Sequence, residues 1–127
     1  MLQSVLLISA GAGIGAVLRW ALGLAFNGAL PLLPLGTLLA NLTGGYCIGL
    51  MLALIAFHPD FPQPLRLFVI TGFLGALTTF STFSGEVVQL IMARHFFAAG
   101  AAVLLHVLGS LLMTALGIAT YTLFARS

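Results

Sequence analysis

The stretch TGFLGALTTFSTFSGE, residues 71–86, is the most informative part of this sequence, because it is polar within an apolar segment of membrane length. It holds three glycines, four threonines, two serines, three phenylalanines and one carboxylate. In hydrocarbon, every backbone group without a partner is strongly unfavourable, so this composition does not suit a passive lipid anchor. We therefore predict a helix that breaks inside the membrane, with freed backbone groups and hydroxyls facing a polar species.

The composition of the whole chain indicates a membrane protein. Of its 127 residues, 61% are hydrophobic and 5% are charged, whereas a soluble domain has about 25% charged residues. Membrane segments use the whole chain, which predicts one all-α transmembrane domain over residues 1–127 and leaves no room for a soluble catalytic module. The sequence contains no catalytic motif, so we do not expect an enzyme.

Four apolar segments are long enough to cross a bilayer. Their expected bounds are residues 2–26, 35–57, 65–93 and 97–124, and the first two loops are rich in proline. The third segment is close to 30 residues long, although about 20 suffice to span the hydrocarbon. Its excess length again predicts a break rather than one straight helix.

The few positive charges are balanced between the two sides of the membrane. Four spans place both termini and the second loop on one side, with Arg66 and Arg126. Arg94 and the Arg19 end of the first span lie on the other side. Because Lys/Arg asymmetry normally sets orientation, this balance favours insertion in both directions and an antiparallel homodimer of inverted copies. The alternative is that a weak bias involving the N-terminal amine fixes one orientation.

Small residues four positions apart allow membrane helices to approach closely. Such pairs occur in the first span, at Gly11 and Gly15, and in the second, at Gly45 and Gly49. We expect close helix contacts at these glycines. Four helices are too few to enclose an aqueous pathway by themselves, so we also expect oligomerisation.

Two phenylalanines in the third segment suggest an anion pathway. Phe80 and Phe83 are three residues apart and so share a helical face, and an aromatic ring has a positive edge that attracts anions. They alternate with hydroxyl residues, whose neutral donors bind an ion without holding it too tightly for conduction. The alternatives are ordinary core or lipid-facing rings, and hydroxyls that bond to their own helix.

The glycines of the same segment suggest a cation site. Gly72, Gly75 and Gly85 surround the hydroxyl cluster, and glycine lets the backbone leave helical geometry. Unwound carbonyls between Gly75 and Thr78 would suit a hard cation such as Na⁺, as unwound backbone does in transporters.

Polar residues in the other spans are further candidates. The amide of Asn41 has two possible roles, donation to an anion or an interhelical hydrogen bond. The last span carries a polar stripe along one face, at His106, Ser110, Thr114, Gly117 and Tyr121.

Two charged residues near or within the membrane also have alternative roles. Glu86 is a candidate proton or cation site, or it lies near the interface and bonds to hydroxyls. Arg19 is expected near a membrane end, where it either raises the anion concentration in a vestibule or anchors the span.

These residues resemble the Fluc family of small bacterial fluoride channels (CrcB-type). The resemblance covers essentially the whole chain and rests on residues 15–20 (GAVLRW), on residues 36–45 and, above all, on the TTFSTFS core of residues 72–84. It implies a passive, fluoride-selective path in the bacterial cytoplasmic (inner) membrane, with two pores at the interface of an antiparallel, dual-topology homodimer. Nothing in the composition itself separates fluoride from chloride.

The resemblance also implies roles for single residues. Phe80 and Phe83 would contact fluoride through their ring edges, and Arg19 would lie at an aqueous vestibule. The sequence departs from the family at Ala76, where many members have a second glycine, and at Ala102 and His106, where some have a tyrosine. Asn41 and Ser110 would be polar partners along the path. A polar track would consist of Ser81, Thr82 and Thr114, with Glu86 near one end. The backbone carbonyls of Gly75 and Thr78 from both subunits would hold a central structural Na⁺.

Two other functions fit a four-helix membrane protein. A small antiparallel exporter that exchanges protons for cationic drugs requires a carboxylate in the first span, and this first span has only Arg19. An assembly subunit of a membrane complex would use the polar stripe of the last span as an interface for another protein.

Overall fold

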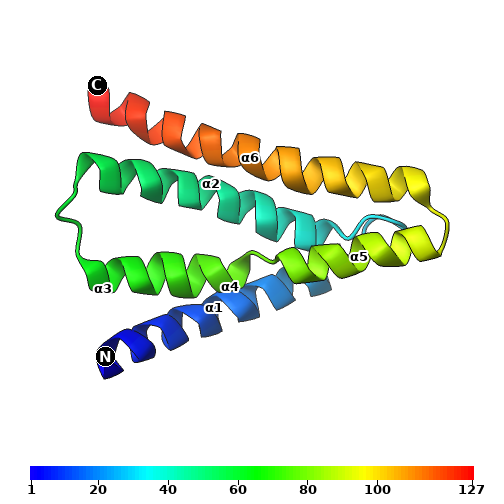
Figure 1. The fold of residues 1–127 in the computed structure, drawn as a ribbon, viewed down its shortest axis with the longest axis horizontal. Coiled ribbons are helices and arrows are strands. Elements are labelled where there is room, and N and C mark those ends of the chain that lie inside the picture. The colour runs from blue at the N-terminus through cyan, green and yellow to red at the C-terminus, as the bar shows by residue number, and fades with distance from the viewer.

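The computed structural model describes residues 1–127 and consists of helices that form four membrane-length spans (Figure 1). The bounds confirm the predicted spans to within two residues at each end. They are α1 Leu2–Phe26, α2 Leu35–Phe57, a third span over Gln63–Met92, and α6 Phe96–Arg126.

The third span is broken near its middle, as the sequence predicts. It begins with α3 (Gln63–Arg66), continues as a π-helical segment η1 (Leu67–Leu74), and reaches α4 (Gly75–Leu77). Thr78 and Thr79 are then extended, with φ/ψ of −84°/152° and −150°/123°. The chain re-enters a helix in α5 (Phe80–Met92). The two extended residues interrupt the hydrogen-bond ladder, so carbonyls at the end of α4 and N–H groups at the start of α5 lose their intrahelical partners.

Local chemistry explains where the second half-helix begins. Thr79 is its N-cap, and the Thr79 hydroxyl accepts a hydrogen bond from the Thr82 N–H at 3.1 Å. Threonine is a favoured N-cap because its hydroxyl satisfies one of the free N–H groups of the first turn. The TTFSTFS motif thus contains its own signal for restarting the helix.

Both chain termini lie at one end of the bundle, together with the loop between α2 and α3 (Figure 1). The turn between α5 and α6 lies at the opposite end. There Arg94 has a left-handed φ of 63°, and the His95 N–H donates to the Leu90 carbonyl at 2.8 Å. These features, with the Arg94 N–H donating to Ile91 at 2.9 Å, form a Schellman motif that ends α5.

Glycines set two close helix contacts, as their spacing predicts. A Cβ on Gly11 would lie 2.9 Å from the Phe73 nitrogen, and one on Gly15 would lie 3.0 Å from the Leu77 nitrogen. These glycines therefore bring α1 against the first half of the third span. On the other side of the bundle, a Cβ on Gly49 would lie 3.0 Å from the Ile118 nitrogen, so the backbones of α2 and α6 also touch.

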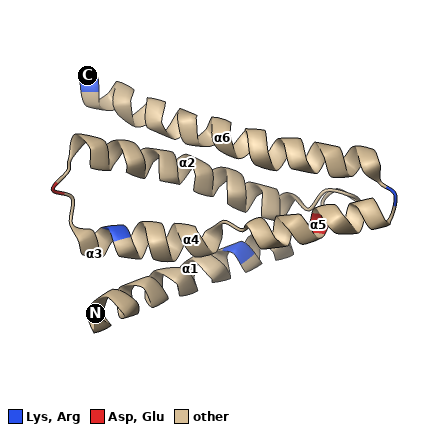
Figure 2. Ribbon diagram, in the orientation of Figure 1, with Lys and Arg blue, Asp and Glu red and all other residues tan.

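The surface of the bundle is mostly apolar. Only 19 of the 127 residues are buried in the single chain, and many large apolar side chains are exposed. Figure 2 shows that charged positions are few and scattered along the chain. Because soluble proteins rarely expose so many large apolar side chains together, this surface fits a protein surrounded by lipid or by further protein.

Candidate functional site

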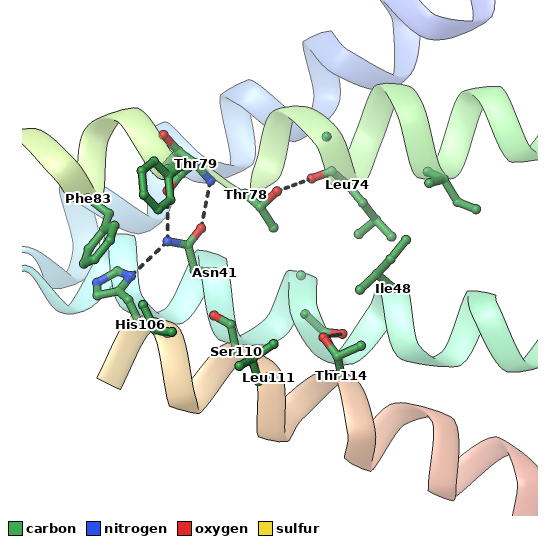
Figure 3. A pocket seen from close by; sticks show the side chains of 16 residues that line it. Asn41, Ile48, Leu74, Thr78, Thr79, Phe83, His106, Ser110, Leu111 and Thr114 are labelled. Atoms are coloured by element: carbon green, nitrogen blue, oxygen red, sulfur yellow. Dashed lines mark hydrogen bonds between the residues drawn. The ribbon is translucent and has the colours of Figure 1, made fainter. Parts of the chain in front are cut away.

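A cavity of about 510 Å³ lies beside the helix break, between α2, the two halves of the third span and α6 (Figure 3). None of its sixteen lining residues carries a permanent charge. The polar ones come from three elements and converge on the break: Asn41 from α2, Thr78 and Thr79 from the break, and His106, Ser110 and Thr114 from α6. Such a lining gives hydrogen-bond donors within a largely apolar wall.

Both phenylalanines of the TTFSTFS motif line this cavity. Phe83 is buried, at 6% exposure, and its ring stacks on the His106 ring with centroids 4.4 Å apart. Phe80 meets Phe83 edge to face, at 5.5 Å and 71°. Phe80 itself is 76% exposed in the single chain, so its ring forms an open edge of the cavity.

The side chain of Asn41 bridges α2 to the break. Its Oδ1 accepts from the Thr79 N–H at 2.8 Å, and its Nδ2 donates to the Thr79 carbonyl at 3.0 Å. Nδ2 also lies 2.9 Å from Nδ1 of His106 (Figure 3). Of the two roles considered for Asn41 from sequence, the structure of a single chain shows the interhelical one.

His106 is the most deeply buried polar side chain at the cavity, with 4% exposure. Its Nδ1 is within hydrogen-bond distance of Asn41, whereas its Nε2 is buried without a partner. A buried donor or acceptor without a partner costs roughly 1–3 kcal/mol. Because most buried polar atoms in folded proteins have a partner, Nε2 of His106 is a candidate to bond to a species outside the single chain.

The hydroxyls considered from sequence fall into two groups. Ser110 and Thr114 line the cavity, and the Thr114 hydroxyl donates to the Gly45 carbonyl at 3.0 Å. Ser81 and Thr82 lie on α5 and are exposed in the single chain. One chain by itself therefore does not assemble the predicted polar track.

Glu86 lies away from the cavity, further along α5. It accepts a hydrogen bond from the Thr37 hydroxyl at 2.7 Å, and the Thr37 N–H donates to Oδ1 of Asn27 at 3.1 Å. Sequence reasoning did not identify Thr37 as a partner. Thr37 falls within residues 36–45, which carry part of the family resemblance, but a hydroxyl in the first turn of a predicted helix is common and did not indicate this partner.

Arg19 lies beside the break, which differs from the expected place near a membrane end. Its Nε donates to the Ala76 carbonyl at 3.0 Å, and Ala76 is near the midpoint of the third span. The guanidinium thus satisfies one of the carbonyls that the break leaves free. The predicted metal residues lie next to it: Gly75 is exposed, and the Thr78 hydroxyl donates to the Leu74 carbonyl at 2.9 Å.

Comparison with known proteins identifies the family of this chain. The model of the CrcB-like family, described as "CrcB-like protein, Camphor Resistance (CrcB)", matches residues 6–118. The chain belongs to the CrcB-like family. A relative in Tolumonas auensis, named fluoride-specific ion channel FluC, is 58% identical over the full length of both chains. FluC proteins of Pseudomonas putida and Chromobacterium violaceum are 54% and 53% identical, over 95% and 99% of this chain and 95% and 100% of their own.

Proposed function

We propose that this protein is a fluoride-selective channel of the bacterial cytoplasmic (inner) membrane. Fluoride would leave the cell by passive electrodiffusion, which lowers its toxicity in the cytoplasm. The observation that carries this proposal is the match to relatives named fluoride-specific ion channels, at 53–58% identity over nearly the whole chain. The identity is high enough, and long enough, that the same activity is the natural expectation.

The cavity supports this function. An anion that sheds its water needs donors, but a fixed positive charge would hold it too tightly to conduct. The lining has no fixed charge and combines hydroxyls with the rings of Phe80 and Phe83. Ring edges carry a partial positive charge, so they would attract a small anion weakly. The unpartnered Nε2 of His106 is a further donor near the same rings.

We further propose that two inverted copies form the channel. Phe80 is 76% exposed and stands at the edge of an open cavity, so a single chain leaves the path incomplete. A second copy on this face would cover Phe80 and add its own hydroxyls, and Ser81 and Thr82 would then join the path with Thr114. The equal charge on the two sides favours insertion in both directions.

A structural Na⁺ at the centre of this dimer fits the residues present. The exposed Gly75 and the extended Thr78 offer carbonyl oxygens at the end of a half-helix, which carries partial negative charge. Hard oxygen ligands of this kind suit Na⁺. Gly75 and Thr78 of both copies would hold the ion, which would add stability to the dimer rather than take part in each transport event.

Arg19 and Glu86 have supporting roles in this proposal. Arg19 would bring positive charge to the vestibule through which fluoride enters, in addition to its bond with the Ala76 carbonyl. Glu86 would lie near one end of the polar track, where it is held by Thr37.

The decisive experiment is ion efflux from liposomes that contain only the purified protein. A fluoride electrode measures release, valinomycin carries the compensating K⁺, and a chloride electrode repeats the measurement for chloride. Fast fluoride release with negligible chloride release is expected. No fluoride release from well-folded protein would remove the channel function and leave a proton-coupled exporter or an assembly subunit to be tested.

A further inference from the structure

The bonds of Asn41 use every hydrogen-bonding position of its amide except one lone pair. Its oxygen accepts from the Thr79 N–H, and its nitrogen donates one hydrogen to the Thr79 carbonyl. The second hydrogen faces Nδ1 of His106 at 2.9 Å. Because Thr79 is the extended N-cap of α5, Asn41 clamps the break through both backbone groups of one residue.

The orientation of this amide follows from the backbone. The Thr79 N–H requires an oxygen and the Thr79 carbonyl requires a donor, so a flipped amide would lose both bonds. The remaining amide hydrogen then points at His106, whose Nδ1 must act as acceptor. In the neutral ring, the hydrogen therefore sits on Nε2.

We propose that His106 is a positioning residue that keeps Asn41 clamped to the helix break. The inference rests on the proposed channel function in so far as the clamp serves transport. Without an acceptor at position 106, one amide hydrogen of Asn41 would be left unpaired inside the membrane, which is unfavourable. The amide would then rotate to find another partner, and Thr79 would lose its bonds.

The surroundings of His106 suit this role. Its ring is 4% exposed and stacks on Phe83, so it cannot follow Asn41 if the amide moves. The same stack ties the clamp to the rings of the cavity. A loosened Thr79 would release the first turn of α5, which carries Phe80 and Phe83, and would change the spacing of the two rings along the path.

Two substitutions separate the acceptor of His106 from its packing. His106→Phe keeps a ring for the stack with Phe83 but offers no acceptor. His106→Asn removes the ring but places an amide oxygen close to the position of Nδ1. Amide hydrogen exchange of Thr79, measured by NMR on the full chain in lipid bicelles, reports the clamp directly. We expect exchange to be about tenfold faster in His106→Phe and within about threefold of wild type in His106→Asn.

Fluoride efflux from liposomes is measured on the same variants. We expect at least a tenfold loss of efflux in His106→Phe and a smaller loss in His106→Asn. If only the packing of the ring mattered, His106→Asn would show the larger loss. Exchange of α1 amides far from the cavity serves as the control for folding. Unchanged Thr79 exchange in folded His106→Phe would overturn the proposal. Faster exchange with wild-type efflux would overturn the link between the clamp and transport.

One measurement on the wild type decides the proposal even if both variants misfold. The ¹⁵N resonances of His106 at neutral pH report which ring nitrogen carries the hydrogen. We expect a bare Nδ1 and a protonated Nε2, and a hydrogen on Nδ1 would overturn the clamp. If the wild type does not transport fluoride, the proposed function fails, whereas the ring resonances and Thr79 exchange still decide whether the clamp exists.

Discussion

Replacing Phe80 with isoleucine tests the anion path with little effect on the fold of a single chain. The Phe80 ring is 76% exposed, and its one aromatic neighbour is Phe83, at 5.5 Å. Losing one such pair costs about 0.5–1.5 kcal/mol, which a folded bundle should tolerate. Phe83→Ile is expected to be more destabilising, because Phe83 is buried and also loses its stack on His106.

The expected effect is on transport rather than on folding. The positive ring edge stabilises a desolvated anion, and losing about 1.4 kcal/mol of that stabilisation at the barrier lowers the rate tenfold. Isoleucine has no quadrupole and cannot replace this term. We therefore expect fluoride flux to fall at least tenfold in Phe80→Ile, with the protein still folded.

Fluoride efflux from liposomes with valinomycin measures this effect. Phe97→Ile is a matched control, because Phe97 is 93% exposed at the start of α6 and lies outside the cavity. The control should retain wild-type flux. Size-exclusion chromatography of each variant checks that the assembled protein is intact. Wild-type flux in both Phe80→Ile and Phe83→Ile would refute the role assigned to the ring edges.

Three further predictions concern other parts of the molecule. Arg94→Gly should raise stability by about 1 kcal/mol, because it relieves the left-handed φ of 63°; thermal unfolding in detergent checks this, and Arg94→Ala, which removes the same charge but keeps a Cβ, should bring no gain. Gly49→Ala should destabilise the protein by about 1–3 kcal/mol, because its Cβ would meet the backbone of α6; Gly13→Ala, where nothing lies within 4 Å, should not, and equal unfolding temperatures would contradict the contact. Asn41→Asp should suppress fluoride flux, because it adds a negative charge to an anion path and removes the donor to the Thr79 carbonyl; unchanged efflux would place this residue outside the path.

The sequence was sufficient to predict the broken third helix. A membrane segment imposes a strict local rule, since hydrocarbon tolerates irregular backbone only where it is compensated. The third span is longer than a bilayer requires, and glycines and hydroxyls are concentrated in one short stretch of it. Together these features indicate an irregular backbone whose free groups are compensated. Close helix contacts at Gly15 and Gly49 were also predictable, because small residues four positions apart let membrane helices approach closely.

The partners of single side chains were harder to predict. Asn41 pairs with Thr79, 38 residues away, and Arg19 pairs with Ala76, 57 residues away. Each of these side chains had at least two reasonable roles from sequence. No local sequence pattern shows whether such a side chain bonds to a backbone carbonyl of another helix, to an anion, to a lipid headgroup or to water.

By itself, the sequence predicted four membrane-length spans and a break in the third, with unwound carbonyls around residues 75–78, and the structure has its extended residues at Thr78 and Thr79. Those features depend on the residues of one contiguous segment at a time, because the free energy of placing a segment in the lipid core depends mainly on its own composition. Only the tertiary structure decided that Asn41 bonds to Thr79 and lies beside His106, and that Arg19 bonds to the Ala76 carbonyl. Hydrogen bonds need partners within about 3 Å, and that proximity depends on how far each helix is rotated and shifted against its neighbours, which the glycine contacts between helices set.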